Sequence, residues 1–68
     1  MIKLGQIYIN KLSHIEYTVI AIHGQKENDR IILKFYTTVF GTLYASYSVK
    51  DIKERCILKE ETKWQSMN

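Results

Sequence analysis

The chain has 68 residues, a formal net charge of +3 and a hydrophobic share of 46%. A chain of this length forms one domain and has no room for a second core. The mild positive charge argues against an acidic mimic of DNA, and it falls short of the dense basic field of a dedicated nucleic-acid-binding arm. One Cys and two His are too few for a disulfide or a four-ligand zinc site, so no metal and no other cofactor is expected.

The ends and the composition of the chain predict where the protein works. The N-terminus turns polar before an apolar run develops, so no signal peptide is expected. No stretch approaches the ~18 apolar residues that a transmembrane helix needs. The unpaired Cys56 suits a reducing compartment. These features predict a cytoplasmic protein with no membrane partner.

The first half of the chain contains two predicted strands. Gly5 precedes an alternating run of β-prone residues, which predicts a strand at 6–10. After a polar turn, the β-branched and aromatic residues of 15–22 predict a second strand. Regular alternation would place Tyr17, Val19 and Ala21 on one face of that strand.

A polar loop at 23–29 leads to the longest β run of the chain, residues 30–40. This run is long for one strand, so a bend or bulge is expected near Thr37 and Thr38. Gly41 and Thr42 would then form a two-residue type II′ turn that pairs Phe40 with Leu43 and opens a fourth strand at 43–48. The buried face of these two strands stays open at this point, because one bulge reverses the assignment.

The segment after the fourth strand predicts a short helix. Ser48 and Asp51 fit a relaxed capping box with Ser48 as the N-cap. The apolar run that begins at Cys56 follows so soon that the helix can have only about one to one and a half turns. Its use would be to turn the chain into a last strand at 56–59, with Ile52 packed inward.

Alternation in that last strand allows only one of Ile57 and Leu58 to point inside. Cys56, in the same apolar run, is interpreted as a buried structural thiol and not as a nucleophile.

The stretches "KLGQIY", "EYTVIAI" and "SVKDIKERCIL" resemble the small SH3-like barrel proteins of phages, prophages and Gram-positive bacteria. The resemblance covers residues 3–59 and departs from the family at "FYTTVF", which lengthens the third strand. It implies an all-β fold: a small SH3-like barrel of about five antiparallel strands with one short helical turn before the last strand. We expect the barrel to occupy residues 1–60, followed by a C-terminal tail at 61–68.

Catalysis needs paired groups in a cleft, and the sequence offers none. His14 and His23 lie at opposite ends of the predicted strand 15–22, and the scattered glycines form no phosphate-binding loop. We therefore predict no catalytic site and no metal site, and we expect the chain not to be an enzyme.

Protein binding is the favoured class of function, because aromatic residues line the grooves of SH3-type domains and strand edges accept a partner strand. Trp64 lies beyond the last predicted strand and either docks on the barrel or contacts a partner. The resemblance implies a phage or prophage protein that binds and modulates a host protein. The candidate partner-binding residues are Tyr17, Tyr36, Tyr44, Tyr47 and Trp64.

The alternative is a small barrel that binds RNA or single-stranded DNA weakly, through basic residues set among aromatic ones. Dispersed lysines predict a weak interaction. The small core and the long central hairpin are also compatible with a homodimer. The candidate nucleic-acid contacts are Lys34, Lys50, Lys53 and Arg55.

Overall fold

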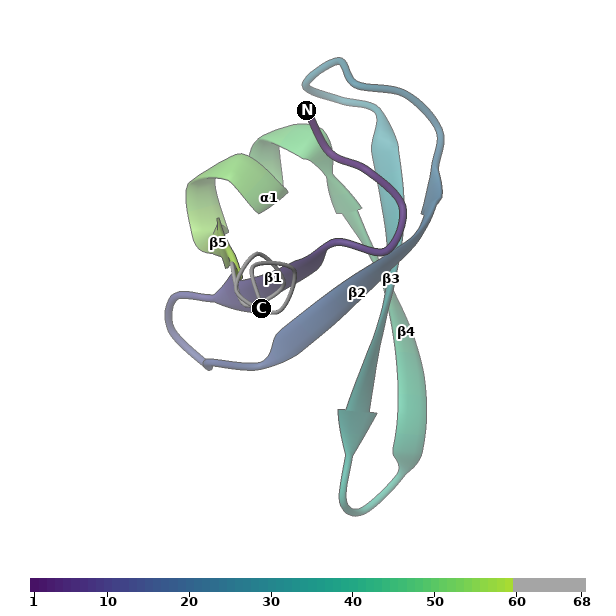
Figure 1. The fold of residues 1–68 in the computed structure, drawn as a ribbon, viewed down its shortest axis with the longest axis vertical. Helices are drawn as coiled ribbons and strands as arrows, with labels where there is room; N and C mark the ends of the chain where they lie inside the picture. The colour runs from purple at the N-terminus through teal and green to yellow at the C-terminus, as the bar shows by residue number, and fades with distance from the viewer. Residues whose placement is uncertain (60–68) are drawn as a thin grey trace, which may run out of the picture.

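The computed structural model describes residues 1–59 of the chain. Within them the elements are β1 (Ile7–Asn10), β2 (Glu16–Ile22), β3 (Arg30–Thr37), β4 (Gly41–Ser48), α1 (Val49–Arg55) and β5 (Cys56–Leu58). The strands form one antiparallel sheet in the order β4-β3-β2-β1-β5 (Figure 1). The mainly-β fold with five antiparallel strands and a short helix before the last strand is therefore confirmed.

The core lies between α1 and one face of the sheet, which we call the inner face. Burial alternates along β2 and β3, because successive side chains of a strand point to opposite faces. Ile31 and Leu33 have no exposed surface, which identifies the inner face of β3. The buried residues are Ile2, Tyr17, Val19, Ile31, Leu33, Val49, Ile52 and Cys56.

A β-bulge in β2 changes which residues reach the inner face. Val19 pairs with Leu33 and Ile22 pairs with Ile31, and the register shifts between them. Because a bulge adds one residue to one strand, the alternation reverses beyond it. Ile22 therefore packs against the core instead of Ala21, and the prediction that Ala21 shares a face with Val19 was wrong.

The β3–β4 hairpin has a different turn from the predicted one. β3 ends at Thr37 and β4 begins at Gly41, so residues 38–40 form the connection, and Phe35 pairs with Leu43. The Phe40 N–H donates to the side-chain oxygen Thr37 Oγ1 at 2.9 Å, and this hydrogen bond holds the two ends of the turn together. Gly41 has φ +74°, a left-handed conformation that glycine adopts at little cost. The two-residue turn and the pairing of Phe40 with Leu43 were therefore wrong.

The cap of α1 is as predicted. The Asp51 N–H donates to Ser48 Oγ at 3.1 Å, and Ser48 has extended backbone angles, as an N-cap residue should. The helix has seven residues, slightly more than expected, and buries Val49 and Ile52 against the inner face. The predicted burial of Ile52 is confirmed at 1% exposure.

The last strand corrects the prediction for its inward residue. β5 follows α1 without a loop, and Cys56, paired with Asn10, takes the inward position at 6% exposure. Ile57 is 57% exposed and Leu58 is 40% exposed, so neither is buried. With Cys56 directed inward, strand alternation turns Ile57 to the opposite face, and Leu58 is the last residue of β5. The interpretation of Cys56 as a buried thiol is confirmed.

We expect Ser48→Ala to lower the free energy of unfolding by about 0.5–2 kcal/mol, since the Asp51 N–H loses its acceptor at the start of α1. Ser48→Asp keeps a capping oxygen and should stay within about 0.5 kcal/mol of the parent. Urea denaturation of the three proteins checks this. Equal losses in both variants would mean that the hydroxyl of Ser48 does not stabilise the helix as a cap.

Candidate functional site

Two of the candidate tyrosines belong to the core. Tyr17 is 6% exposed, and its ring packs edge-on against Phe35 with ring centroids 5.1 Å apart. Tyr47 is half-buried beside it, and the two hydroxyl groups are hydrogen-bonded at 3.2 Å. The rings of Tyr17 and Tyr47 are thus held by packing against other aromatic residues.

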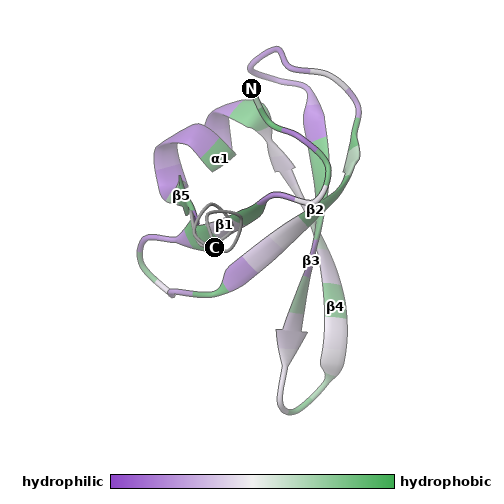
Figure 2. Cartoon of the chain, viewed as in Figure 1, coloured by the Kyte–Doolittle hydropathy of each residue, from purple (hydrophilic) through white to green (hydrophobic). Residues whose placement is uncertain are grey.

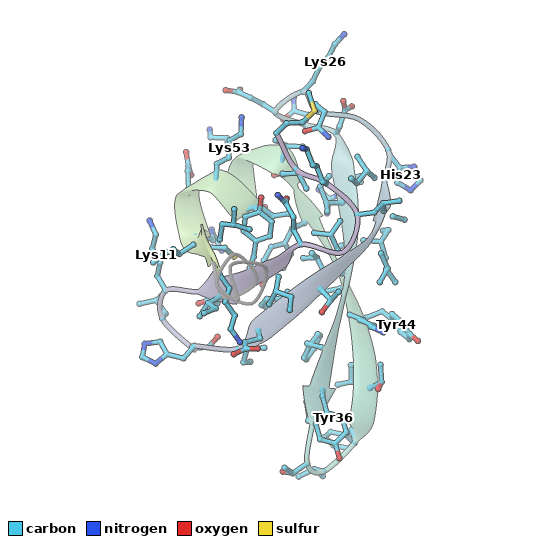
Figure 3. All side chains as sticks on the ribbon, viewed as in Figure 1. Lys11, His23, Lys26, Tyr36, Tyr44 and Lys53 are labelled. Carbon is cyan, nitrogen blue, oxygen red and sulfur yellow. The ribbon has the colours of Figure 1, made fainter. Side chains whose placement is uncertain are left out.

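Tyr36 and Tyr44 lie instead on the opposite, outer face of the sheet, where they are 71% and 66% exposed. Tyr36 pairs with Thr42 and Lys34 pairs with Tyr44, so the two rings are diagonal neighbours across β3 and β4. Figure 3 shows both tyrosines on the hairpin, which extends away from α1. The ammonium group of Lys34 stands on the same face as both rings.

The turn of the hairpin adds two further apolar residues that the sequence analysis missed. Val39 and Phe40 are 78% and 75% exposed at the tip, where the chain is hydrophobic in Figure 2. The predicted strand 30–40 included Val39 and Phe40, although Gly41 directly after them could have indicated that they belong to a turn. We call Tyr36, Val39, Phe40 and Tyr44 the hairpin surface.

A cleft of about 480 Å³ lies beside the hairpin surface, between the start of β2, the end of β3 and the start of β4. Glu16 lines the cleft and forms an ion pair with Lys59, with Nζ and Oε2 3.1 Å apart. Lys34 has no carboxylate within ion-pair distance among residues 1–59, so its positive charge is available at the cleft. The lining residues are His14, Ile15, Glu16, Thr18, Lys34, Phe35, Tyr36 and Thr42.

The groups considered for catalysis or metal binding do not assemble in the described part of the chain. His14 lines the cleft, whereas His23 follows β2 at its other end. Burial raises the pKa of the Cys56 thiol, which disfavours the nucleophilic thiolate. Between residues 1 and 59 no three His, Cys, Asp or Glu side chains are grouped to hold a metal ion.

The candidate nucleic-acid contacts are divided between two sides of the sheet. Lys34 is on the outer face, whereas Lys50, Lys53 and Arg55 are on α1, which covers the inner face. Arg55 also lies 3.9 Å from a carboxylate oxygen of Asp51, a pair of exposed side chains that contributes little stability. Only Lys34 therefore stands beside exposed aromatic rings.

Trp64 lies outside the described residues, as does the predicted tail at 61–68. Among residues 1–59, no helix combines the length and the apolar character that crossing a membrane requires.

No family model matches the chain, and no curated protein and no solved structure is significantly similar to it. Within the described residues, the hairpin surface gathers exposed apolar side chains and the adjoining cleft presents the charge of Lys34.

Proposed function

We propose that this chain is a non-enzymatic protein-binding module of the small SH3-like barrel type, which contacts its partner through the hairpin surface. One observation carries the proposal: four large apolar side chains are 66–78% exposed on a single protruding hairpin. Large apolar side chains gathered on one exposed element are unfavourable in water and mark interaction sites. Tyrosine is moreover enriched among the residues that dominate binding energies at interfaces.

The cleft beside the hairpin surface supports the same function and indicates the chemistry of the partner. Its lining combines the ammonium group of Lys34 and the hydroxyl groups of Tyr36 and Thr42 with the apolar ring of Phe35. Glu16, the carboxylate of the cleft, is paired with Lys59 at 3.1 Å. A segment that carries a carboxylate next to an apolar side chain fits this distribution of charge.

The sequence resemblance supports the biological setting of the proposal. Residues 3–59 resemble small SH3-like barrel proteins of phages, prophages and Gram-positive bacteria. The resemblance implies a phage or prophage protein, and such small proteins often bind and alter a host protein. We therefore place the partner in the host cell and the interaction in the cytoplasm.

The test is affinity capture from a host-cell lysate, followed by mass spectrometry and by titration of the captured protein. The bait is compared with the triple variant Tyr36→Ser, Phe40→Ser, Tyr44→Ser. We expect this variant to lose the partner, since each aromatic hot spot contributes about 2 kcal/mol or more, or ~30-fold in affinity. The matched control is Leu4→Ser, which removes an apolar side chain that is 65% exposed outside the hairpin.

The control variant should keep the partner, and both variants should keep the far-UV circular dichroism of the parent. Retention of every captured protein by the triple variant would show that the hairpin surface is not the binding site. Loss of the partner by Leu4→Ser as well would mean that general stickiness of apolar side chains explains the capture.

Nucleic-acid binding is the second candidate, favoured by the position of Lys34 beside the exposed rings of Tyr36 and Tyr44. Bases stack on such rings, and the lysine would contact a phosphate. With a single lysine at the rings, we expect a Kd above about 1 µM for single-stranded RNA even at about 50 mM salt. Fluorescence anisotropy measures this. A sub-micromolar Kd that weakens steeply towards about 200 mM salt would make nucleic acid the preferred partner.

A further inference from the structure

We propose that two copies of this chain associate through the free edge of β4 and form a symmetric dimer with one continuous sheet. β4 lies at the end of the sheet, and β3 is its single neighbouring strand in the described part of the chain. The proposal goes beyond the protein-binding function and does not rest on it, because it uses backbone groups at the edge of the sheet and not the side chains of the outer face.

The hydrogen-bond pattern identifies the free backbone groups of β4. The Val49 N–H donates to the Asp29 carbonyl at 3.0 Å, directly beyond the pair of Arg30 and Ser48. In an antiparallel ladder, hydrogen-bonded pairs alternate with pairs that are not hydrogen-bonded to each other. The odd-numbered residues of β4 therefore bond to β3, and the even-numbered ones direct their N–H and C=O groups to the free edge.

Part of this edge is already covered by a side chain. Arg30 Nη2 donates to the Ser46 carbonyl oxygen at 2.9 Å, and Arg30 Nε donates to Ser46 Oγ at 3.0 Å. Charged side chains at an edge prevent pairing with another strand. Thr42 and Tyr44 lie beyond this cover, and their N–H and C=O groups have no loop or side-chain partner among residues 1–59.

A two-fold axis at Leu43 matches these free groups. It pairs Thr42 with Tyr44 of the partner subunit, and Tyr44 with Thr42 of the partner subunit. Each pair then exchanges two backbone hydrogen bonds, so the N–H and C=O groups of Thr42 and Tyr44 are used in both copies. Such an interface is isologous, because the same strand contributes to both sides.

The side chains of β4 permit this pairing. β4 itself contains no charged residue and no proline, so the part that Arg30 does not cover lacks the usual protection against edge pairing. No like charges oppose each other across the axis. Lys34 lies one strand away on β3. At ~4.8 Å per strand, the two Lys34 residues would be about 14 Å apart, beyond the screening length of ~8–10 Å in physiological salt.

The other edge of the sheet does not offer the same opportunity. β5 has three residues and follows α1 directly, and short edge strands are poor templates for pairing. We therefore assign the free edge of β4 to β4 of a second copy. That strand has the same length, the same uncharged composition and the same free backbone groups.

The first experiment is sedimentation equilibrium of the full chain at concentrations up to about 500 µM, where even small, transient interfaces are occupied. We expect a reversible monomer–dimer equilibrium. Tyr44→Pro removes an N–H that faces the free edge and leaves the β3–β4 ladder intact, so it should weaken the dimer at least about tenfold. The matched control Tyr44→Thr loses the same ring but keeps the N–H, and it should still dimerise.

The second experiment tests the register and does not depend on the proline variant. Leu43→Cys should give a covalent dimer on mild oxidation, because the two-fold axis brings the two sulfur atoms together. Ala45→Cys should not, since a two-fold axis at Leu43 separates these residues beyond the ~7 Å that a disulfide spans between Cα atoms. The parent, which contains the buried Cys56, is the blank.

Three outcomes would overturn the proposal: a monomer at all concentrations, an undiminished dimer in the folded Tyr44→Pro variant, or equal cross-linking of Leu43→Cys and Ala45→Cys. None of these results concerns a second protein. Failure of the dimer is therefore distinguishable from failure of the protein-binding function, which the affinity capture decides.

Discussion

Ile52→Ala is expected to lower the free energy of unfolding by about 2–5 kcal/mol, whereas Ile57→Ala should cost less than about 1 kcal/mol. The two variants make the same chemical change and differ in burial, since Ile52 is 1% exposed and Ile57 is 57% exposed. α1 contributes to the core through Ile52 and Val49. Truncation of Ile52 leaves a cavity between the helix and the sheet, whereas truncation of Ile57 leaves none.

Urea denaturation followed by circular dichroism measures both variants. A domain this small has a total stability near the low end of about 5–15 kcal/mol, so Ile52→Ala should be partly unfolded at 25 °C. If Ile52→Ala were as stable as Ile57→Ala, α1 would not be packed on the inner face, and the arrangement that delivers β5 to β1 would fail with it.

The protein is also expected to lose stability between pH 10 and pH 12 because of Tyr17. Burial raises the pKa of Tyr17 to about 12 from its ordinary value of 10. The hydrogen bond with Tyr47 adds to this shift, followed by charge repulsion from Tyr47 and Cys56. The folded state therefore holds the proton more tightly than the unfolded state. The stabilisation is complete below pH 10 and is lost as the pH rises through 12, by about 2–3 kcal/mol at most.

Urea midpoints measured at intervals from pH 8 to pH 12 test this dependence. Tyr17→Phe should cost about 0.5–1.5 kcal/mol at neutral pH, since the Tyr47 hydroxyl loses its partner, but it should flatten the decline above pH 10. Tyr36→Phe is the matched control, because its ring is 71% exposed, and it should decline like the parent. A decline of the same size in Tyr17→Phe would assign the alkaline loss of stability to other groups.

The dimer and the hairpin surface are compatible in one assembly. Pairing through the β4 edge continues the sheet, so the outer faces of the two hairpins would lie side by side and their exposed tyrosines would form one larger aromatic face. A protein partner would then meet two copies of the hairpin surface at once. Linked contacts of this kind raise the apparent affinity without any new contact.

Interactions between residues close in the chain were predictable. The β-branched and aromatic runs around β2 and β3 mark the strands, because such side chains fit a pleated, half-buried surface. The cap of α1 joins Ser48 to Asp51, three residues away, so its sequence pattern is sufficient to predict it. The short distance from that cap to the apolar Cys56 also bounded the helix.

Positions that depend on pairing between strands were not predictable in the same way. The composition of β2 does not predict the bulge that turns Ile22 inward, because a bulge depends on how β2 pairs with β3. The hairpin turn was missed for a similar reason, since a threonine side chain closes it and shifts every pair behind it. One shifted residue exchanges the two faces of a strand, so a local error became an error in the faces.

The amino-acid sequence alone determined that this chain forms strands with a capped helix before the last one, because propensities and caps act over three or four residues. Tertiary contacts decided what reaches the core and what stays exposed. Ile2 packs into the core, and Gln25, distant in the chain, holds its backbone by donating to its carbonyl at 2.7 Å and accepting from its N–H at 3.1 Å. Likewise, Lys59, directly after β5, forms an ion pair with Glu16 of β2. Lys34 therefore remains the unpaired charge at the cleft among the described residues. Such contacts depend on chain segments that meet only when the sheet is assembled.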